Sequence, residues 1–322
     1  MKAIRFEDRS IHEVDIPVPG LETGEALVRV LTAGICATDM ALLQGYAGFD
    51  GIPGHEFVGI VEKCPERPGL AGKRVVADIN TGCGCTPDPR HCPHRRTLGI
   101  RGQNGAFAEY VVVSANNLHP VADAIQTRHA VLAEPLAAAL EISQQVHITH
   151  RERVGVVGDG CLGLLTAISM RHCSGRVTLV GRHPDKLSIA WKQGVETILA
   201  HPGDTPEQVA AKTGKFDVTV DATGNPQGLD WCIPLTRPEG RVVVKTTTPE
   251  KPSIDMAAVV VNELVLQGSR CGDMSLALDY LEYGRIDVEP LIEAVYPFTR
   301  FRDAFWHASK KGGLKVLLDF SA

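Results

Sequence analysis

The chain has 322 residues, of which 44% are hydrophobic and 22% are charged. This length exceeds what a single hydrophobic core usually serves, so two domains are expected. The formal net charge of -5 gives no basic footprint for nucleic acid or for an acidic membrane surface. Small-molecule chemistry is the function class that remains.

The first ten residues, MKAIRFEDRS, contain no apolar segment of the kind found in secretory signals, and no apolar run is long enough to span a bilayer. The nine cysteines are odd in number and lack the dense, even spacing of a disulfide scaffold. We therefore expect a cytoplasmic protein with reduced thiols, some of which are metal ligands.

Short β-rich runs, separated by loops with Gly and Pro, fill the chain from Met1 to about Val113. These runs lie at 26–31, 58–62, 74–78 and 108–113. The pattern predicts an all-β, barrel-like domain.

Residues 34–59 read GICATDMALLQGYAGFDGIPGHEFVG, with Cys36 before, and His55 and Glu56 after, a loop of four glycines and a proline. A soft thiolate, an imidazole and a carboxylate brought together by a turn are typical of a zinc site that keeps one position open for substrate. Taken singly, a cysteine or a histidine is more often a core residue. Asp39 strengthens the metal interpretation, because a ligating histidine commonly donates its other ring hydrogen to a carboxylate.

A long segment at 80–105 has almost no apolar side chains, which is typical of a functional or stapled loop. Its cysteines, Cys83, Cys85 and Cys92, leave two alternatives open: a structural zinc site, or a trimmed loop with free thiols. The fourth ligand of a structural zinc would come from a neighbouring acidic or imidazole side chain: Asp88, His91 or His94.

The composition shifts to Ala and Leu from Arg128 onward. Pro135 suits the first turn of a helix, where its missing N–H costs nothing. Glu134, directly before this proline, is ordinarily a partner of the helix dipole.

Residues 153–170 read RVGVVGDGCLGLLTAISM, an apolar strand that runs into three glycines and then into a helix. This is the context that the dinucleotide-binding fingerprint requires. The first glycine makes the turn, the second lets the pyrophosphate approach the backbone, and the third permits close packing of the helix, whose N-terminus supplies positive potential. The predicted coenzyme-binding residues of this loop are Gly158, Gly160, Cys161, Leu162 and Gly163.

Later strands repeat at the spacing of βαβ units and predict a doubly wound parallel sheet with helices on both faces. The run DATGN at 221–225 falls at the carboxyl end of a strand, where such folds bind ligands. Thr223 and Gly224 are therefore coenzyme-binding candidates, although Gly224 is equally typical of an ordinary turn. The expected strands are 176–180, 216–221, 241–245 and 264–268, with helices at 184–193 and 226–235 among the segments between them.

NAD-binding folds usually place an acidic residue about twenty residues past the glycine motif, where it accepts hydrogen bonds from the ribose hydroxyls. At that place this chain has Gly181, followed by Arg182 and His183. No carboxylate there would repel a 2′-phosphate, and a guanidinium pairs with phosphate bidentately. The sequence therefore predicts NADP as the preferred coenzyme and NAD as the alternative. The other interpretation is that Arg182 is one more surface arginine.

The runs GICATD, GHEFVG, EPLA and GDGCLG together resemble the zinc-dependent medium-chain dehydrogenase/reductase family, in particular its branch of polyol, glucose and threonine dehydrogenases. The resemblance covers nearly the whole chain. It implies an α/β protein with a GroES-like β-barrel catalytic domain, made of residues 1–135 and 272–322, and a Rossmann domain at 136–271. It also implies a homodimer or a homotetramer.

The resemblance further implies that Cys36, His55 and Glu134 bind a catalytic Zn²⁺, with Glu56 as an occasional or exchangeable ligand. Members of the family often carry a lobe with four cysteines that bind a second, structural zinc. The lobe of this chain is shortened and keeps only three cysteines.

The implied reaction is reversible oxidation of an alcohol to a carbonyl, with hydride passing to or from the nicotinamide. The predicted catalytic residues are Thr38, which would relay the substrate proton, together with Asp39 and Glu56. Many relatives continue the relay with a histidine where this chain has Ala41, so here the proton must leave through water, ribose or another group.

The sequence does not name the alcohol or carbonyl substrate. Four side chains suggest a polar ligand such as a polyol or a sugar: Gln44, Tyr46, Phe49 and Arg270, the last of which is also a coenzyme-binding candidate. Two alternatives have the same fold. A zinc-free quinone or enone reductase is disfavoured by the intact set of metal ligands, and a cofactor-binding protein without turnover is a second alternative, since fold alone does not fix function.

Overall fold

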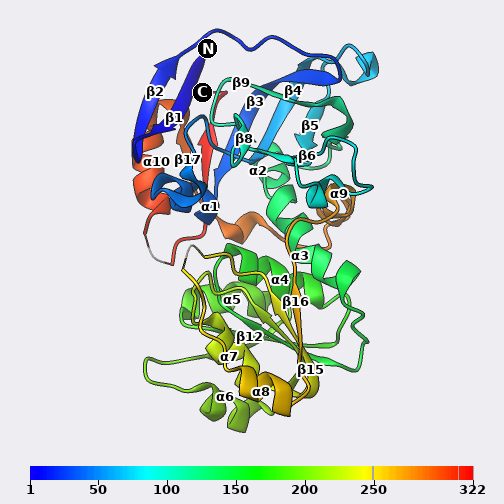
Figure 1. Cartoon of the computed structure of the whole chain (residues 1–322), viewed down its shortest axis with the longest axis vertical. Helices are drawn as coiled ribbons and strands as arrows, with labels where there is room; N and C mark the ends of the chain where they lie inside the picture. Colours follow the sequence, from blue (N-terminus) through cyan, green and yellow to red (C-terminus); the bar gives the residue numbers. More distant parts are fainter. Residues whose placement is uncertain (249, 311, 322) are drawn as a thin grey trace. The chain divides into compact units, whose positions relative to one another are not determined.

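The structure is a computed structural model that describes residues 1–248, 250–310 and 312–321 and divides the chain into two compact units. Unit 1 comprises Met1–Glu134 and Met274–Ala322, and unit 2 comprises Pro135–Asp273. In Figure 1 unit 1 contains both the blue and the red ends of the colour scale, and unit 2 contains the green-to-gold middle of the chain. Unit 1 is therefore discontinuous in sequence, with divisions after Glu134 and Asp273 where the sequence analysis placed them after residues 135 and 271.

Unit 1 is mostly antiparallel β-structure, as the β-rich runs of its sequence predict. Its main sheet has seven strands in the order β10-β5-β4-β3-β18-β17, with β9 also paired to β3. The C-terminal strand β18 lies between β3 and β17, so the end of the chain completes a sheet that the N-terminal segment begins. The strands are β3 (Glu25–Ile35), β4 (Glu56–Lys63), β5 (Arg74–Ala77), β9 (Tyr110–Ser114), β10 (Leu118–Pro120), β17 (Ile292–Pro297) and β18 (Lys315–Asp319).

The remaining elements of unit 1 surround this sheet. Phe305 of the C-terminal helix α10 packs edge-on against Phe6 of β1 and against Phe107 in the loop before β9, with ring centroids 5.6 and 5.5 Å apart. The other strands are β1 (Lys2–Glu7), β2 (Ser10–Asp15), β6 (Asn80–Thr81), β7 (Arg96–Leu98) and β8 (Gly102–Gln103). The helices are α1 (Ala37–Leu43), α2 (Thr127–Ala130), α9 (Met274–Glu282) and α10 (Phe301–Ala308).

Unit 2 is a six-stranded sheet in the order β13-β12-β11-β14-β15-β16, and every neighbouring pair is parallel. The strand order reverses at β11, which pairs with β12 on one side and β14 on the other, and such a switch point is where doubly wound sheets bind ligands. Its strands are β11 (Arg153–Val157), β12 (Arg176–Gly181), β13 (Glu196–Leu199), β14 (Phe216–Asp221), β15 (Thr236–Val244) and β16 (Val265–Gly268).

Six helices accompany the parallel sheet of unit 2 in the described residues. The edge strand β13 has the sequence ETIL, too short and too polar to be recognised as a strand, and the sequence analysis missed it. The helices are α3 (Ala133–Gln145), which begins at the end of unit 1, α4 (Cys161–Met170), α5 (Pro184–Lys192), α6 (Pro206–Thr213), α7 (Gly228–Leu235) and α8 (Met256–Val261).

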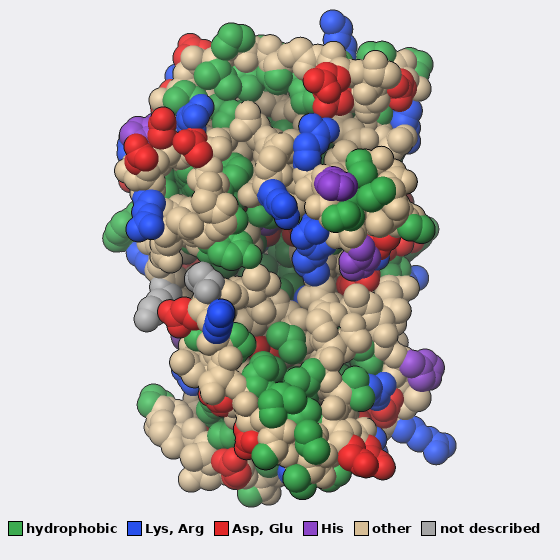
Figure 2. Space-filling model, viewed as in Figure 1, with side chains coloured by type: hydrophobic (Ala, Val, Ile, Leu, Met, Phe, Trp, Pro, Cys, Tyr) green, Lys and Arg blue, Asp and Glu red, His purple; other side chains and the backbone are tan. Residues whose placement is uncertain are grey.

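The surface mixes charges of both signs: acidic and basic side chains both occur on the visible face of each unit (Figure 2). Within the described ranges, no helix combines the length and the apolar composition needed to cross a membrane.

Candidate metal and coenzyme sites

Cys36 stands at the junction between β3 and α1, where it is the N-cap residue of the helix. The backbone N–H of Cys36 donates to Asp39 Oδ2 at 2.8 Å, and the Asp39 side chain is fully buried. Because this hydrogen bond closes the first turn of α1, the positions of the thiol and of the carboxylate are fixed relative to each other. Thr38, the second residue of α1, is partly buried, and its role in proton relay stays a prediction.

The antiparallel pairing of β3 and β4 returns the chain to Cys36 after the glycine-rich loop. Glu56 begins β4 and lies opposite Gly34 in this register, with His55 directly before it. The ligand atoms of Cys36, His55 and Glu56 all lie within 4.8 Å of one another. The fold thus brings together three residues that the sequence proposes as metal ligands.

His55 and Asp39 face each other, with Nδ1 and Oδ1 3.5 Å apart, and neither atom has a hydrogen-bond partner among the described residues. Burial alone would lower the pKa of His55, but the negative charges of Asp39 and Cys36 outweigh burial and raise it well above the usual 6.5. A cation would relieve this buried negative charge. The unpartnered atoms and the S, N and O donors therefore fit a zinc ion.

Besides its place in the cluster of possible metal ligands, Glu56 forms a buried ion pair that the sequence analysis missed. Lys315 Nζ donates to the two Glu56 carboxylate oxygens at 2.8 and 2.6 Å, and lies 3.3 Å from the carbonyl oxygen of Ile35. Both charged side chains are buried, with 5% of Lys315 and 1% of Glu56 exposed. Because Glu56 already holds an ammonium group, it could bind a metal only in competition with Lys315.

Gly34 makes room for this ion pair. A Cβ at Gly34 would collide with Glu56 Oε2 and would lie 3.3 Å from the Lys315 side chain. The pairing of β18 with β3 places Val316 opposite Ile35, so the neighbouring lysine reaches the site from the far end of the chain. In the sequence, the only signal was a lysine next to the apolar run VLL.

Glu134 lies in the first turn of α3, is partly buried, and is the last residue of unit 1. Among the described residues the ligand cluster has three members, and Glu134 is not one of them. Its assignment as a zinc ligand stays a prediction, which requires its carboxylate to approach Cys36 and His55.

Three sulfur atoms converge in the lobe between β6 and β7. The Sγ atoms of Cys83 and Cys85 each lie 3.5 Å from Cys92 Sγ, which is buried. Hydrogen bonds from the backbone N–H groups of Cys83 and His94 outweigh burial and lower the pKa of the Cys92 thiol to about 7. Hydrogen bonds with the two other thiols raise the pKa of Cys85 to about 11. The three cysteines therefore favour a thiolate at Cys92 with two further sulfur atoms 3.5 Å from it, and such a sulfur cluster is suited to a soft cation.

The expected fourth ligand of this lobe is not in the cluster, which has only the three cysteines within the described chain. Asp88 instead caps the short 3-10 helix Pro89–His91 and binds Arg90 through backbone and side chain. The His91 side chain is 70% exposed, and its Nε2 lies 3.7 Å from Asp88. The alternatives of a structural zinc and a trimmed loop therefore both remain.

The glycine-rich loop of unit 2 has the backbone geometry that a dinucleotide needs. Gly158 has φ +112°, and a Cβ there would lie 2.5 Å from the Ala222 carbonyl oxygen. A Cβ at Gly163 would collide with the carbonyl of Gly158, so this glycine permits close packing of α4. At Gly160, the N-cap of α4, a Cβ would meet nothing within 4 Å, which leaves the helix N-terminus accessible to a phosphate.

The carboxyl end of β12 carries a carboxylate that comes from another segment. Asp159 Oδ2 accepts hydrogen bonds from the backbone N–H groups of Arg182 at 2.6 Å and His183 at 2.8 Å, and Oδ1 lies 3.0 Å from His183 Nδ1. Burial would raise the pKa of Asp159, but these hydrogen bonds outweigh it and hold the pKa below its usual 3.8. The expectation that no carboxylate lies at this strand end is therefore wrong, although Gly181 itself provides none.

The DATGN turn is held by its own aspartate. Asp221 is buried, and its Oδ1 accepts from the backbone N–H and the hydroxyl of Thr223 and from the hydroxyl of Thr246. Gly224 has φ +64°, which supports its interpretation as a turn glycine. Arg270 is exposed, and its carbonyl accepts from Lys245 Nζ at 2.6 Å.

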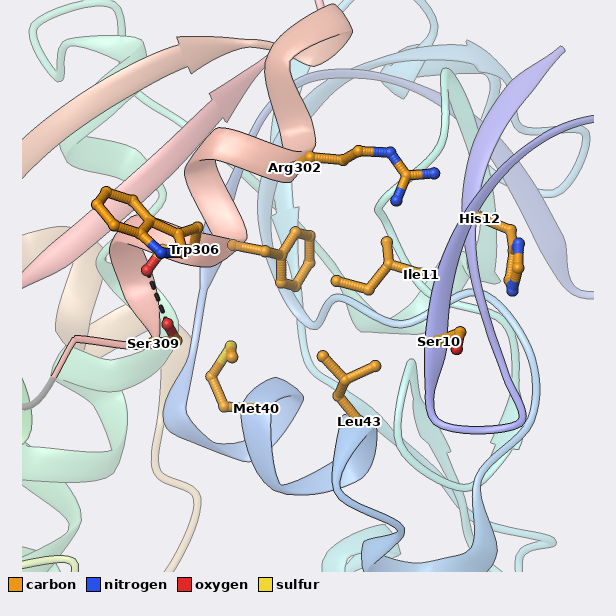
Figure 3. Close-up of a pocket in the computed structure, with 9 residues that line it drawn as sticks. Ser10, Ile11, His12, Met40, Leu43, Arg302, Trp306 and Ser309 are labelled. Atoms are coloured by element: carbon orange, nitrogen blue, oxygen red, sulfur yellow. Dashed lines mark hydrogen bonds between the residues drawn. The ribbon is translucent and has the colours of Figure 1, made fainter.

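Unit 1 also has a groove of about 530 Å³ (Figure 3). Met40 and Leu43 of α1 line it together with side chains from β2 and α10, among them Ile11 and Arg302. Cys36, His55 and Glu56 do not line it. The cluster of Cys36, His55 and Glu56, and not this groove, is therefore the candidate active site.

Two family models match the chain. Residues 22–123 match the alcohol dehydrogenase GroES-like domain, and residues 161–283 match the zinc-binding dehydrogenase domain. The erythritol/L-threitol dehydrogenase of Mycolicibacterium smegmatis is 31% identical over 336 residues, which cover 94% of this chain and 93% of that protein.

Two crystal structures extend the likeness to the fold. An alcohol dehydrogenase (rspB) from Escherichia coli CFT073, complexed with NADH, has a TM-score of 0.90 at 28% identity and covers 99% of both chains. A zinc-binding dehydrogenase from Sinorhizobium meliloti, bound to NADP, has a TM-score of 0.88 at 28% identity and covers 99% of this chain and 98% of its own. The predicted fold class, a GroES-like domain with a Rossmann domain, is confirmed. The chain belongs to the zinc-dependent medium-chain dehydrogenase family, whose members are NAD(P)-dependent enzymes that act on alcohols and polyols.

Proposed function

We propose that the chain catalyses reversible oxidation of an alcohol to a carbonyl, with hydride passing to or from the nicotinamide of NAD(P). The observation that carries this proposal is the convergence of the Cys36, His55 and Glu56 ligand atoms within 4.8 Å, in a chain that also holds a dinucleotide-binding loop. Unit 1 is then the catalytic domain and unit 2 the coenzyme domain.

In this proposal Cys36, His55 and Glu134 would hold the zinc, and Glu56, which pairs with Lys315, would be an exchangeable ligand. A bound zinc supplies Lewis acidity, which lowers the pKa of a hydroxyl group toward neutrality. Asp39 orients the His55 ring through the Nδ1 side, since its own position is fixed by the Cys36 N–H. From its place in the first turn of α1, the Thr38 hydroxyl would relay the substrate proton, taking it up on its oxygen and passing its own proton on to water.

A polyol or sugar alcohol is the substrate class we propose. The curated relative described above acts on erythritol and L-threitol, and Gln44, Tyr46 and Phe49 of unit 1 offer polar and aromatic contacts. A screen of simple alcohols, polyols and sugars with NAD and NADP, in the presence of zinc, tests this proposal. Turnover only with enones or quinones, and without bound zinc, would instead identify a zinc-free reductase. Coenzyme binding without any turnover would identify a non-catalytic relative.

We expect the unmodified protein to prefer NADP over NAD by at least about tenfold in kcat/KM, equivalent to ~1.4 kcal/mol. The exposed Arg182 guanidinium has no acidic partner among the described residues, so it is available to a 2′-phosphate. Arg182→Ala should remove most of the preference. Arg176→Ala is the matched control. Arg176 lies at the amino end of β12, the strand that precedes Arg182, and its removal should leave the coenzyme preference unchanged. Steady-state kinetics that show NAD preferred by the unmodified protein would contradict this expectation.

We propose that the lobe cysteines serve structure and not chemistry, whether or not they hold a second zinc. Cys83→Ser and Cys92→Ser should lower the melting temperature or change assembly and leave kcat within about twofold, because their sulfurs form a cluster separate from that of Cys36. Metal analysis gives the zinc stoichiometry, and Cys173→Ser controls for loss of a thiol elsewhere. A fall in kcat at unchanged melting temperature and assembly would place the active site in the lobe.

We also propose that the protein forms a homo-oligomer through the edge of the unit 2 sheet. Strand β16 is an edge strand, and Val265 on it and Val261 on α8 are 53% and 80% exposed. Val265→Lys should shift the protein toward the monomer in light scattering after gel filtration, whereas Val18→Lys, at an exposed valine of unit 1, should not. A monomeric unmodified protein would refute this proposal.

The nine cysteines are all free thiols, which suits a protein of the reducing cytoplasm, the compartment that we propose.

A further inference from the structure

The carboxylate of Asp159 takes the space that a side chain at position 181 would need. A Cβ on Gly181 would lie 2.5 Å from Asp159 Oδ2 and 2.6 Å from Asp159 Cβ. The two residues that follow Gly181 donate their backbone N–H groups to that same oxygen. The glycine at the strand end and the aspartate in the loop are therefore complementary, and a substitution such as Gly181→Asp would displace Asp159.

This carboxylate lies at the edge of the sheet where the adenosine ribose of a dinucleotide is expected. Strands β11 and β12 are parallel neighbours with Val157 opposite Val180, so the loop after β11 and the turn after β12 share one edge. In dinucleotide-binding folds the end of the second strand carries the acid that accepts from the ribose hydroxyls. Here a buried carboxylate reaches that place from the glycine-rich loop.

Two opposing charges therefore meet at the same turn. The Arg182 guanidinium is exposed, lacks an acidic partner within the described residues, and would attract a 2′-phosphate. Asp159 would repel it, because like charges brought close in a partly buried site disfavour each other. The ring of His183, 46% exposed, lies against Asp159 and covers one side of the carboxylate.

We propose that Asp159 is a specificity-determining residue for the coenzyme, acting in two ways. It positions the β12–α5 turn by accepting from the backbone N–H groups of Arg182 and His183, and its negative charge disfavours a 2′-phosphate. Asp159 thereby limits the preference for NADP that Arg182 creates. The inference rests on the proposed binding of a nicotinamide dinucleotide to unit 2.

Asp159→Asn tests this inference, because it removes the charge and keeps the size and one acceptor oxygen. Dissociation constants for NADPH and NADH, measured by the fluorescence of the reduced coenzymes, should shift toward NADPH by at least about fivefold in their ratio. The same shift should appear in the ratio of the KM values for NADPH and NADH. Competition by 2′,5′-ADP relative to 5′-ADP gives a readout that does not depend on turnover. Asp230→Asn, which removes an exposed charge on α7, is the matched control and should leave every ratio unchanged.

If Asp159→Asn does not fold, Asp159→Ser keeps a hydroxyl acceptor without the charge and should shift the ratio in the same direction. A ratio within about twofold of the unmodified protein, or an equal loss of affinity for both coenzymes, would mean that Asp159 only supports the turn, and would overturn the inference. Failure of the unmodified protein to bind either coenzyme would instead overturn the proposed function and this inference with it.

Discussion

Cys36→Ser is expected to lower kcat/KM by at least about 10³-fold, which corresponds to ~4 kcal/mol of transition-state stabilisation. The protein should also lose one equivalent of zinc per chain. The reason is that a serine hydroxyl replaces a thiolate, the softest donor of the Cys36, His55 and Glu56 cluster. The dissociation constant for the coenzyme should stay within about twofold, because the glycine-rich loop belongs to unit 2. Metal analysis, steady-state kinetics and coenzyme fluorescence measure the three quantities.

Cys64→Ser is the matched control for this prediction. Cys64 is a buried cysteine of unit 1, directly after β4, and it belongs to neither cysteine cluster. This variant should keep its zinc and its rate. Full activity of Cys36→Ser after exhaustive chelation would show that the cluster does not carry the chemistry.

Lys315→Met should lower the free energy of unfolding by about 3–5 kcal/mol, because it leaves the buried Glu56 carboxylate without its counter-charge. Thermal or urea unfolding of the zinc-depleted protein measures the loss directly. In the zinc-loaded protein the loss should be smaller, since Glu56 is then free to bind the metal. That difference separates the proposed ligand exchange from a purely structural ion pair.

The double variant Glu56→Leu with Lys315→Met should recover most of the stability lost in Lys315→Met, because two apolar groups replace both charges. Lys2→Met supplies the control: its partner Glu13 is exposed and their ion pair is 3.3 Å long, so we expect a cost below about 1 kcal/mol. Equal costs for Lys315→Met and Lys2→Met would refute the importance of the buried pair.

Local patterns predicted part of the secondary structure, including the strands of the coenzyme unit that have clear apolar runs. The strands β11, β12 and β14 and the helix α5 were recognised because apolar runs, glycines and a helix-starting proline are short-range signals. The strand β13 was missed because its four residues ETIL carry no such pattern. The discontinuity of the catalytic unit came from the family resemblance, since no local signal tells that the chain returns.

The candidate site was predictable where its residues lie close in sequence or belong to a motif. Cys36, His55 and Glu56 fall within one stretch, and the glycines of the coenzyme loop lie within six residues of one another. Lys315 and Asp159 were missed for one physical reason. The partner of a charged side chain depends on which residues the fold places beside it. Pairing of β18 with β3 places Lys315 beside Glu56, and pairing of β11 with β12 places Asp159 beside the turn after β12.

The sequence by itself determined the two chemistries, a soft metal site and a dinucleotide loop, because ligand type and glycine spacing are properties of short segments. The tertiary structure decided which charges act on them. Pairing of β18 with β3 brings a buried ammonium to Glu56. Parallel pairing of β11 with β12 brings the Asp159 carboxylate to a strand end that appeared to lack one. Electrostatic interactions depend on distance and burial, and both are set by the folded chain.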